Sequence, residues 1–280
     1  MKRIAIQGIK GSFHDIACHR YFEGEDVELL CCETFEQVFD NLAKDEDTLG
    51  LVAIENTIAG SLLRNYELLR ESGSTIVGEL KLRISHSIMC LPNEDWDDLT
   101  EVNSHPVALM QCREFLGKHP NMKVVEVVDT AGAAADIQRL QLAHHAAICH
   151  KDAAKIYGMK VLEEGIETNK HNFTRFLVLS HPSKANLLRS EGGTNKASLS
   201  FALPHEEGSL SAILSVLSFY KINLTKIQSL PIIGKEWQYC FYVDLTFTDP
   251  TRYRQAITAI TPLTQDLKIL GEYKNGKQCI

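Results

Sequence analysis

The chain has 280 residues, of which 44% are hydrophobic, and its formal net charge is −7 at pH 7. A chain of this length and composition can bury one large core or two smaller ones, so we expect two structural units and exclude a disordered or fibrous protein. No segment carries the basic stripe typical of nucleic-acid binding, so we expect no nucleic-acid partner.

The charge is distributed unevenly along the chain. Residues 1–196 hold 21 Lys and Arg against 29 Asp and Glu, a balance of −8, whereas residues 197–280 hold 8 against 7, a balance of +1. An acidic protein still binds a small anion where helix N-termini and one or two cations act locally, because surface charge is screened over about 8 to 10 Å.

Targeting and metal-binding signals are weak. The N-terminus passes from two basic residues into a strand pattern too brief for a signal-peptide core, and no apolar run approaches the roughly 18 residues of a membrane span. The eight cysteines include no CxxC pair, and His144 and His145, which cluster with His150, would project apart on a helix. We therefore predict a soluble cytoplasmic protein with no membrane partner, no metal and no cofactor.

Five times in residues 1–180, a β-rich run leads through a polar or glycine-containing junction into a segment with helical spacing. Such alternation predicts parallel sheets with crossover helices, in which ligands bind beyond the carboxyl ends of the strands. The predicted strands and helices pair as 3–6 with 13–21, 49–54 with 62–70, 101–103 with 107–116, 123–128 with 133–140, and 146–149 with 152–157.

Hydroxyl side chains occur at four of these junctions, namely Ser12, Ser61, Ser104 and Thr130. Each is a good N-cap residue, and capping alone would explain any one of them. Four helix starts that converge on one crevice would also present unpaired backbone N–H groups, which is how proteins build an anion site. We predict such a site.

Residues 169–180 form a polar loop that runs into an apolar strand, with Thr174 and Arg175 at the strand entrance. A threonine can donate to a leaving oxygen, and an arginine can hold a carboxylate with two hydrogen bonds. The alternative is a hairpin with a solvated arginine.

The last hundred residues follow a different pattern. Residues 182–196 contain a proline and two glycines and are typical of a linker. Residues 197–280 then predict the order βαββαβ of a small α+β ferredoxin-like module. Its strands are expected at 197–203, 224–230, 237–247 and 267–273, and its helices at 208–220 and 251–261.

Five motifs occur in a fixed order: Gly11-Ser12-Phe13; Glu55-Asn56-Thr57 with Gly60-Ser61; Ser104-His105-Pro106 with Ala108-Leu109 and Gln111-Cys112; Asp129-Thr130-Ala131; and Asn172-Phe173-Thr174-Arg175-Phe176. Together with the C-terminal module they make the chain similar to the prephenate dehydratases that carry an ACT regulatory domain. The resemblance covers nearly the whole chain.

The resemblance implies a two-lobed α/β catalytic region, residues 1–181, similar to type 2 periplasmic binding proteins, with the active site between the lobes. Residues near 1–80 and 162–181 would form one lobe and residues 81–161 the other. The linker 182–196 and an ACT domain over 197–280 would follow.

The implied reaction converts prephenate to phenylpyruvate with loss of water and carbon dioxide, in phenylalanine biosynthesis. The resemblance makes Thr174 the principal catalytic residue, hydrogen-bonding the departing oxygen, and gives Asn56, Ser104 and Gln111 the orientation of the substrate and its leaving group. From its place before Pro106, His105 is expected to cap the helix start or to orient Ser104. Arg175 is the candidate for a substrate carboxylate, with a structural ion pair to Glu55 as the alternative. The remaining expected substrate contacts are Ser12, Glu55, Thr57, Ser61, Thr130, Ala131 and Phe176.

Phenylalanine is the implied allosteric ligand of the ACT domain. The family's Gly-Ala-Leu and Glu-Ser-Arg-Pro motifs appear here as Gly208-Ser209-Leu210 and Gln228-Ser229-Leu230-Pro231, so two charges are lost and recognition of an amino acid should weaken or change. The expected ligand-binding residues are Gly208, Ser209, Leu210, Asn223, Leu224, Gln228 and Ser229. A homodimer or homotetramer is also implied.

Two alternatives stay open at this point. Arogenate dehydratase would use the same constellation on a substrate that bears an amine. A non-catalytic protein that binds a small carboxylate and senses an amino acid would need no catalytic Thr174.

Overall fold

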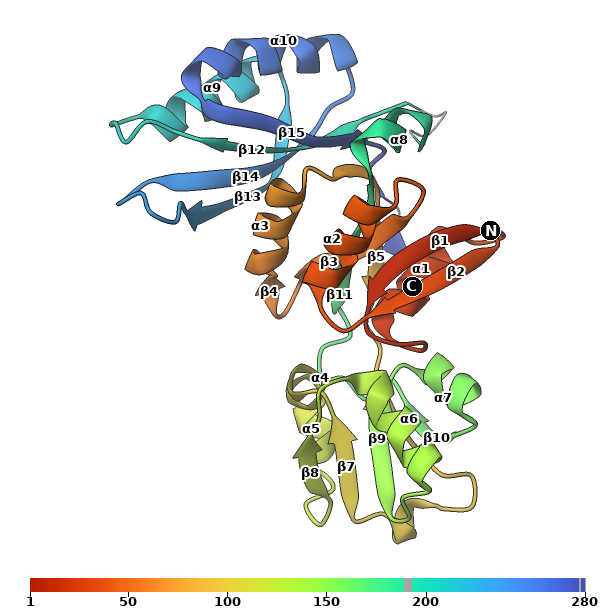
Figure 1. The fold of residues 1–280 in the computed structure, drawn as a ribbon. Coiled ribbons are helices and arrows are strands. Elements are labelled where there is room, and N and C mark those ends of the chain that lie inside the picture. Colours follow the sequence, from red (N-terminus) through yellow and green to blue (C-terminus); the bar gives the residue numbers. More distant parts are fainter. Residues whose placement is uncertain (189–192, 277, 280) are drawn as a thin grey trace.

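The computed structural model describes residues 1–188, 193–276 and 278–279. Within them the strands form three sheets, one for each lobe of a two-lobed region and one for a C-terminal module. Figure 1 shows the first lobe in the middle, the second lobe below it and the module above it. No helix in these described ranges is long and apolar enough to cross a membrane.

The first lobe is built on the sheet β16-β5-β11-β3-β1-β2, with the short β4 paired to β3. Apolar strands form its core because both faces are covered, with Ile4, Leu51 and Phe176 almost fully buried. The strands are β1 (Lys2–Gln7), β2 (Val27–Cys32), β3 (Leu49–Asn56), β4 (Gly60–Ser61), β5 (Thr75–Arg83), β11 (Phe173–Ser180) and β16 (Gln278–Cys279); the helices are α1 (Phe13–Tyr21), α2 (Phe35–Lys44) and α3 (Leu63–Ser72).

The second lobe is built on the sheet β10-β6-β9-β7-β8. Two crossing segments, residues 84–86 and 165–172, connect it to the first lobe. The amide of Ile84 on one donates to the carbonyl oxygen of Asn172 on the other across 2.8 Å. Its elements are β6 (Ser87–Cys90), η1 (Trp96–Asp98), β7 (Glu101–Ser104), α4 (Pro106–Gln111), α5 (Arg113–Leu116), β8 (Lys123–Glu126), α6 (Thr130–Leu140), β9 (His145–Cys149), α7 (Lys151–Tyr157) and β10 (Lys160–Glu164).

The C-terminal module is an antiparallel sheet of order β13-β14-β12-β15. Two helices cover one face around buried Leu199, Phe201 and Ile213, and the opposite face lies against the first lobe (Figure 1). Its elements are β12 (Lys196–Ala202), α9 (Ser209–Phe219), β13 (Asn223–Pro231), β14 (Tyr239–Thr246), α10 (Pro250–Ile260), η2 (Thr261–Leu263) and β15 (Gln265–Tyr273), in the order βαββαβ.

Several sequence predictions need correction. The sheets are mixed rather than wholly parallel, because β11 runs antiparallel to both β3 and β5, and β9 runs antiparallel to β6. The lobe boundaries shift, since β5 extends the first lobe to Arg83 and β10 pairs with β6 in the second lobe. The predicted linker contains helix α8 (Pro182–Leu188), and its residues 189–192 lie outside the described ranges. Strand β16 returns from the C-terminal region to β5.

Candidate active site between the lobes

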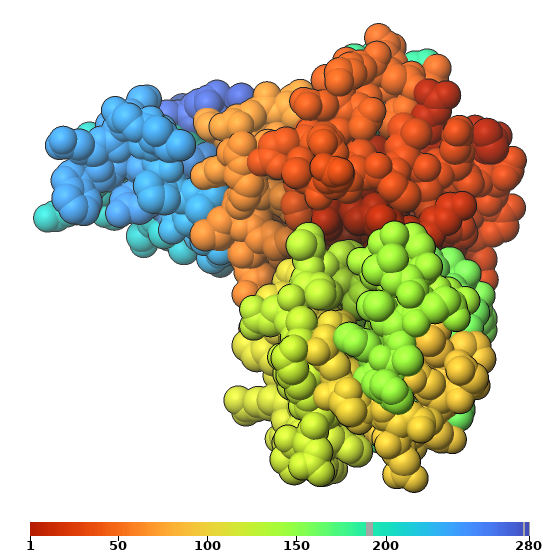
Figure 2. All heavy atoms as spheres, turned by 60° about the horizontal axis from the view of Figure 1, so that its bottom comes forward, coloured from red at the N-terminus to blue at the C-terminus, as the bar shows by residue number. Residues whose placement is uncertain are grey.

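A cleft of about 330 Å³ lies between the two lobes and takes side chains from both. Figure 2 shows the yellow-to-green second lobe in contact with the red and orange first lobe. We call this space the interlobe cleft. Its polar and aromatic lining includes Gln7, Ser12, Phe13, His14, Asn56, Thr174 and Phe176 from the first lobe and its strands, and His86, His105, Gln111, Asp129 and Thr130 from the second lobe and the crossing segments.

Thr174 and Asn56 are paired at the ends of two adjacent strands. Their backbones face each other in the β11–β3 register, and the Asn56 side-chain amide donates to Thr174 Oγ1 across 2.9 Å. The orientation of that amide is fixed, because Asn56 Oδ1 accepts the backbone N–H groups of Ile58 and Ala59 at 2.9 and 2.8 Å. Thr174 Oγ1 therefore acts as an acceptor toward Asn56, and its own hydrogen is left to donate into the cleft.

Three helices begin at the cleft, namely α1, α4 and α6, and each has a side-chain cap. Ser12 caps α1 by accepting the amide of Asp15, and Asp129 caps α6 by accepting the amide of Gly132. His105 caps the short α4. The first turn of a helix leaves backbone N–H groups unpaired and carries the positive end of the helix dipole. Among the described residues that line the cleft none is Lys or Arg, so these helix starts supply the positive field.

His86 links the cleft to the crossing segments. Its Nε2 lies 2.9 Å from Gln111 Oε1, so the proton of the neutral ring sits on Nε2. Its backbone amide donates across 2.9 Å to the carboxylate of Glu167, which is fully buried and also accepts from Arg83. Burial lowers the pKa of His86. Gln111 is thus held by a neutral imidazole that is itself anchored where the chain crosses between the lobes.

His14 lines the cleft beside Phe176. Its Nε2 accepts the backbone amide of Ala53 across 3.3 Å, and its ring meets the Phe176 ring edge-on at a centroid distance of 5.1 Å. Burial lowers the pKa of His14 to about 4. The ring is therefore neutral at physiological pH.

The structure brings together six of the predicted site residues: Ser12, Asn56, Gln111, Thr130, Thr174 and Phe176. Three others do not line the cleft. Ser104 is fully buried, and its hydroxyl donates to the carbonyl oxygen of Ile148 across 2.5 Å. Thr57 is exposed and bonds the backbone of the loop at residues 171–173, and Ala131 is buried inside α6.

The capping predictions were also wrong at three of four junctions. Of the four predicted residues, only Ser12 caps a helix. His105, rather than Ser104, caps α4, and Asp129, rather than Thr130, caps α6. Helix α3 begins after Leu62 without a side-chain cap, although a cap from Ser61 was expected. In the first two cases a neighbouring His or Asp supplies the acceptor, which moves the helix start by one residue.

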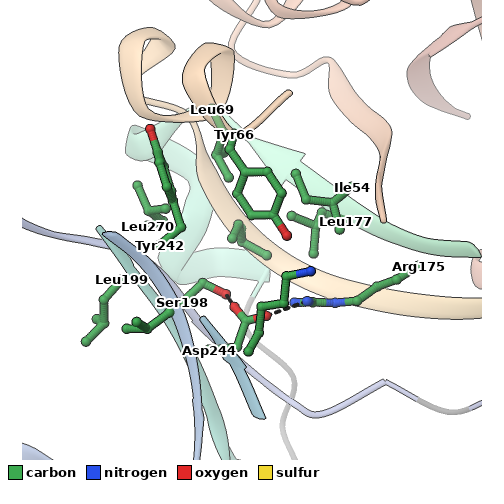
Figure 3. Close-up of a pocket in the computed structure, with 13 residues that line it drawn as sticks. Ile54, Tyr66, Leu69, Arg175, Leu177, Ser198, Leu199, Tyr242, Asp244 and Leu270 are labelled. Atoms are coloured by element: carbon green, nitrogen blue, oxygen red, sulfur yellow. Dashed lines mark hydrogen bonds and ion pairs between the residues drawn. The ribbon is translucent and has the colours of Figure 1, made fainter. Parts of the chain in front are cut away.

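Arg175 was predicted to bind a substrate carboxylate, and the structure places it on the other side of the strand. Successive residues of a strand face opposite ways, so Arg175 points away from the side that Thr174 occupies. Its guanidinium donates to Glu79 at 2.7 Å and to Glu55 at 3.1 Å, and it also pairs with Asp244 of the C-terminal module. Figure 3 shows the dashed contact from Arg175 to Asp244 across the junction.

We call this set of six side chains the buried charge cluster. The first lobe contributes two carboxylates and one guanidinium, and the module contributes two ammonium groups and one carboxylate. Lys196 Nζ lies 2.8 Å from Glu79, and Lys226 pairs with Glu55 and donates to Ser61 at 2.7 Å. The members are Glu55, Glu79, Arg175, Lys196, Lys226 and Asp244.

The cluster has three positive and three negative charges, so it is formally neutral only when the lobe and the module are joined. Burial on its own would raise the pKa of Asp244 and of Glu79, but Arg175 and Lys196, together with the hydrogen bonds that each carboxylate accepts, outweigh burial and lower both pKa values. The junction leaves about 10 Å³ of space beside these groups, at the lower limit for one water molecule. Glu55 and Ser61, like Arg175, therefore contact the module and do not line the interlobe cleft.

The predicted regulatory residues are dispersed within the module. Ser209 and Leu210 line a surface pocket of about 140 Å³ together with Trp237 and Tyr239. Gly208 precedes α9 with a φ of +81°, a conformation that favours glycine. The other four residues lie on strand β13, outside that pocket: Asn223, Leu224, Gln228 and Ser229.

Sequence reasoning missed His14, Phe13 and His86 as cleft residues. His14 directly follows the quoted Gly-Ser-Phe motif at the start of a predicted helix, so its place at the cleft could have been found from that motif. His86 had no such signal, because strand β6 and the crossing segment before it were not predicted.

Comparison with known proteins places this chain in a family. The family model for prephenate dehydratase matches residues 4–184, more than half of the chain. The bifunctional chorismate mutase/prephenate dehydratase of Buchnera aphidicola is 30% identical over 274 residues, covering 96% of this chain and 70% of that protein.

Two solved structures share the fold over almost the whole chain. The prephenate dehydratase of Arthrobacter aurescens, in complex with L-Phe, has a TM-score of 0.87 at 24% identity, covering 98% of this chain and 90% of that one. A structure described as a novel type of quorum quenching acylase has a TM-score of 0.86 at 28% identity, covering 98% of each chain. The family predicted from the motifs is confirmed by the family model and the Buchnera relative: the chain belongs to the prephenate dehydratase family.

Proposed function

We propose that this family member converts prephenate to phenylpyruvate with loss of water and carbon dioxide, and that the interlobe cleft is where it does so. The observation that carries the assignment of the site is the Thr174 hydroxyl, which accepts from Asn56 and keeps its hydrogen for a ligand in the cleft.

The chemistry demands little covalent machinery. Prephenate carries two carboxylates and a ring hydroxyl, and the ring becomes aromatic when the hydroxyl leaves as water and one carboxylate leaves as carbon dioxide. The protein must orient the dianion and stabilise the departing oxygen. A hydroxyl is too weak an acid to give up its proton outright, so Thr174 acts by a hydrogen bond that strengthens as charge develops on that oxygen.

The hydrogen bond from Asn56 makes the Thr174 hydroxyl a stronger donor. A hydroxyl that accepts a hydrogen bond becomes a better donor, because successive hydrogen bonds polarise one another. The helix starts at Ser12, His105 and Asp129 provide backbone N–H groups for the carboxylates. Gln111, held by His86, is placed to orient the leaving group or a water molecule.

The test is turnover of prephenate by the purified protein, followed by the appearance of phenylpyruvate. Replacing Thr174 by Val keeps the shape and removes the donor, and kcat should fall about 100-fold or more. Thr100→Val is the matched control, because that exposed hydroxyl bonds a backbone carbonyl in the second lobe. No turnover of prephenate by the wild-type protein would refute the function, and near-normal kcat in T174V would refute the assigned role.

The same assay separates the alternatives. An arogenate dehydratase would prefer arogenate in a parallel incubation, and a non-catalytic carboxylate-binding protein would release no ring product from either compound.

The acylase activity described for one structural neighbour gains no specific support from the cleft. Among the described residues that line the cleft, no hydrogen bond joins a Ser, Thr or Cys side chain to a histidine, as an activated nucleophile would require.

We also propose that the C-terminal module is an ACT domain that responds to phenylalanine, and that the protein is a homodimer or homotetramer. Its βαββαβ order and the L-Phe complex of the Arthrobacter relative support the first proposal. Calorimetry with millimolar phenylalanine should give heat, and turnover should fall; sedimentation should give a mass above one chain. The pocket beside Ser209 and Leu210 is the place to begin mutagenesis.

A further inference from the structure

We propose that His14 contacts the substrate: as a neutral imidazole it donates Nδ1–H to a carboxylate oxygen of the bound dianion. This inference rests on the proposed function of the interlobe cleft and adds a residue to it.

The tautomer of His14 follows from one backbone contact. The amide of Ala53 donates to His14 Nε2 across 3.3 Å, and a backbone amide can only donate. The contact exists because the pairing of β1 with β3 stops at Ile6 and Leu51, which leaves the Ala53 amide without a strand partner on that side. Since Nε2 holds a lone pair, a neutral ring must carry its proton on Nδ1.

The Nδ1–H group is open to the cleft. Within the described part of the chain His14 makes no second hydrogen bond, and Nδ1 is not among the fully buried atoms that lack a partner. The ring borders the interlobe cleft and is held between Phe176 and Phe35, at centroid distances of 5.1 and 5.5 Å. A fixed donor therefore faces the substrate space with its hydrogen unused.

The position suits one end of prephenate. Phe176, against which the ring packs, is two residues from Thr174 on the same side of β11, a spacing of roughly 7 Å. In prephenate the ring hydroxyl and the carbon that bears a carboxylate lie at opposite ends of the six-membered ring. With the hydroxyl at Thr174, a carboxylate falls toward His14.

A neutral donor also fits the reaction better than a cation. The departing carboxylate loses its charge as carbon dioxide forms, so a cation would stabilise the ground state more than the transition state. The burial that lowers the pKa of His14 to about 4 keeps the ring neutral at working pH.

Two substitutions separate this role from a structural one. In His14→Gln the side-chain oxygen can replace Nε2 as acceptor for the Ala53 amide, but no donor remains at the Nδ1 position. In His14→Asn the side-chain amide can replace Nδ1 as donor, but the Ala53 amide loses its acceptor. We expect H14Q to keep the wild-type melting temperature while kcat/KM for prephenate falls roughly 10- to 100-fold, mainly through KM. H14N should melt lower and retain more of kcat/KM than H14Q.

The opposite ranking, with full kcat/KM in H14Q, would overturn the proposal while leaving the proposed function intact. Nitrogen-15 NMR of the wild-type protein gives a second readout: the His14 ring should show protonated Nδ1 and bare Nε2, and prephenate or a dicarboxylate analogue should shift the Nδ1 signal. A ring protonated on Nε2, or an Nδ1 signal that does not shift when prephenate or the analogue is added, would also overturn the proposal. If the wild-type protein turns over no prephenate at all, the proposed function fails and this inference fails with it.

Discussion

Asp244 offers the sharpest test of how the C-terminal module is attached to the first lobe. Its carboxylate lies between Arg175 and the Ser198 hydroxyl, with 8% of the side chain exposed. Asp244→Asn changes one atom's chemistry and leaves no cavity. The buried charge cluster then has three positive and two negative charges, so one cation is uncompensated in a site with almost no room for water.

Removing one partner of a buried ion pair typically costs about 3 to 5 kcal/mol. We expect that loss in the free energy of unfolding of D244N, measured by urea denaturation at pH 7.5. It is a large fraction of a typical stability of roughly 5 to 15 kcal/mol. Because the pKa of Asp244 lies below its usual range, the carboxylate is charged at this pH, and its contribution is lost progressively as pH falls from the ordinary carboxyl pKa to that lowered value.

The matched control is Asp266→Asn. Asp266 also pairs with an arginine across the same junction, Arg70, but 57% of its side chain is exposed. An exposed pair contributes about 0 to 1 kcal/mol. If D244N and D266N lose the same small amount of stability, the buried charge cluster does not hold the module and the reasoning is refuted.

Three further predictions concern Asn56 and His14 at the cleft and Arg175 at the junction with the module. Asn56→Asp keeps an oxygen for the amides of Ile58 and Ala59 but cannot donate to Thr174, so the Thr174 hydroxyl would turn toward the new carboxylate. The kcat for prephenate should fall about as far as in T174V. A kcat within threefold of wild type would contradict the proposed orientation of the hydroxyl. Arg175→Lys keeps the charge but loses the planar guanidinium that spans Glu79 and Asp244. The free energy of unfolding should drop by about 1 to 3 kcal/mol, and kcat should fall with it. An unchanged urea midpoint would argue against a role for the guanidinium geometry. His14 has a native pKa of about 4 against 6.5 for the ordinary side chain, so the unfolded chain takes up the proton first as pH falls and stability is lost below pH 6.5. Between pH 7.5 and 4.5 the wild-type protein should lose roughly 2.5 kcal/mol more than H14Q in urea denaturation, and parallel pH curves would show that His14 titrates normally.

Much of the architecture could be predicted because local signals and tertiary packing agree. Helix α1, the Ser12 cap and the position of Thr174 at the end of β11 all follow from patterns within a few residues. The second lobe's edge strand β10 could not be found that way. Its pairing with β6 is decided by residues about 70 positions away.

The errors at Arg175 and Glu55 have a different origin. Both residues adjoin cleft residues in the sequence, and a guanidinium beside a catalytic hydroxyl is typical of carboxylate binding. The period of two along a strand places neighbours on opposite sides, but which side faces the cleft depends on what packs behind β11. Only the arrangement of the module, which supplies Asp244, decides that.

The alternation along β11 has a practical consequence for anyone who maps this enzyme by mutation. The peptide unit between residues 174 and 175 borders both the interlobe cleft and the junction with the C-terminal module, so a disturbance at the junction reaches the Thr174 hydroxyl without passing through any intervening side chain. Loss of turnover after a change at position 175 would thus imitate the loss of a substrate contact. Only a structural measurement made alongside the kinetics would distinguish a disrupted junction from a lost substrate contact.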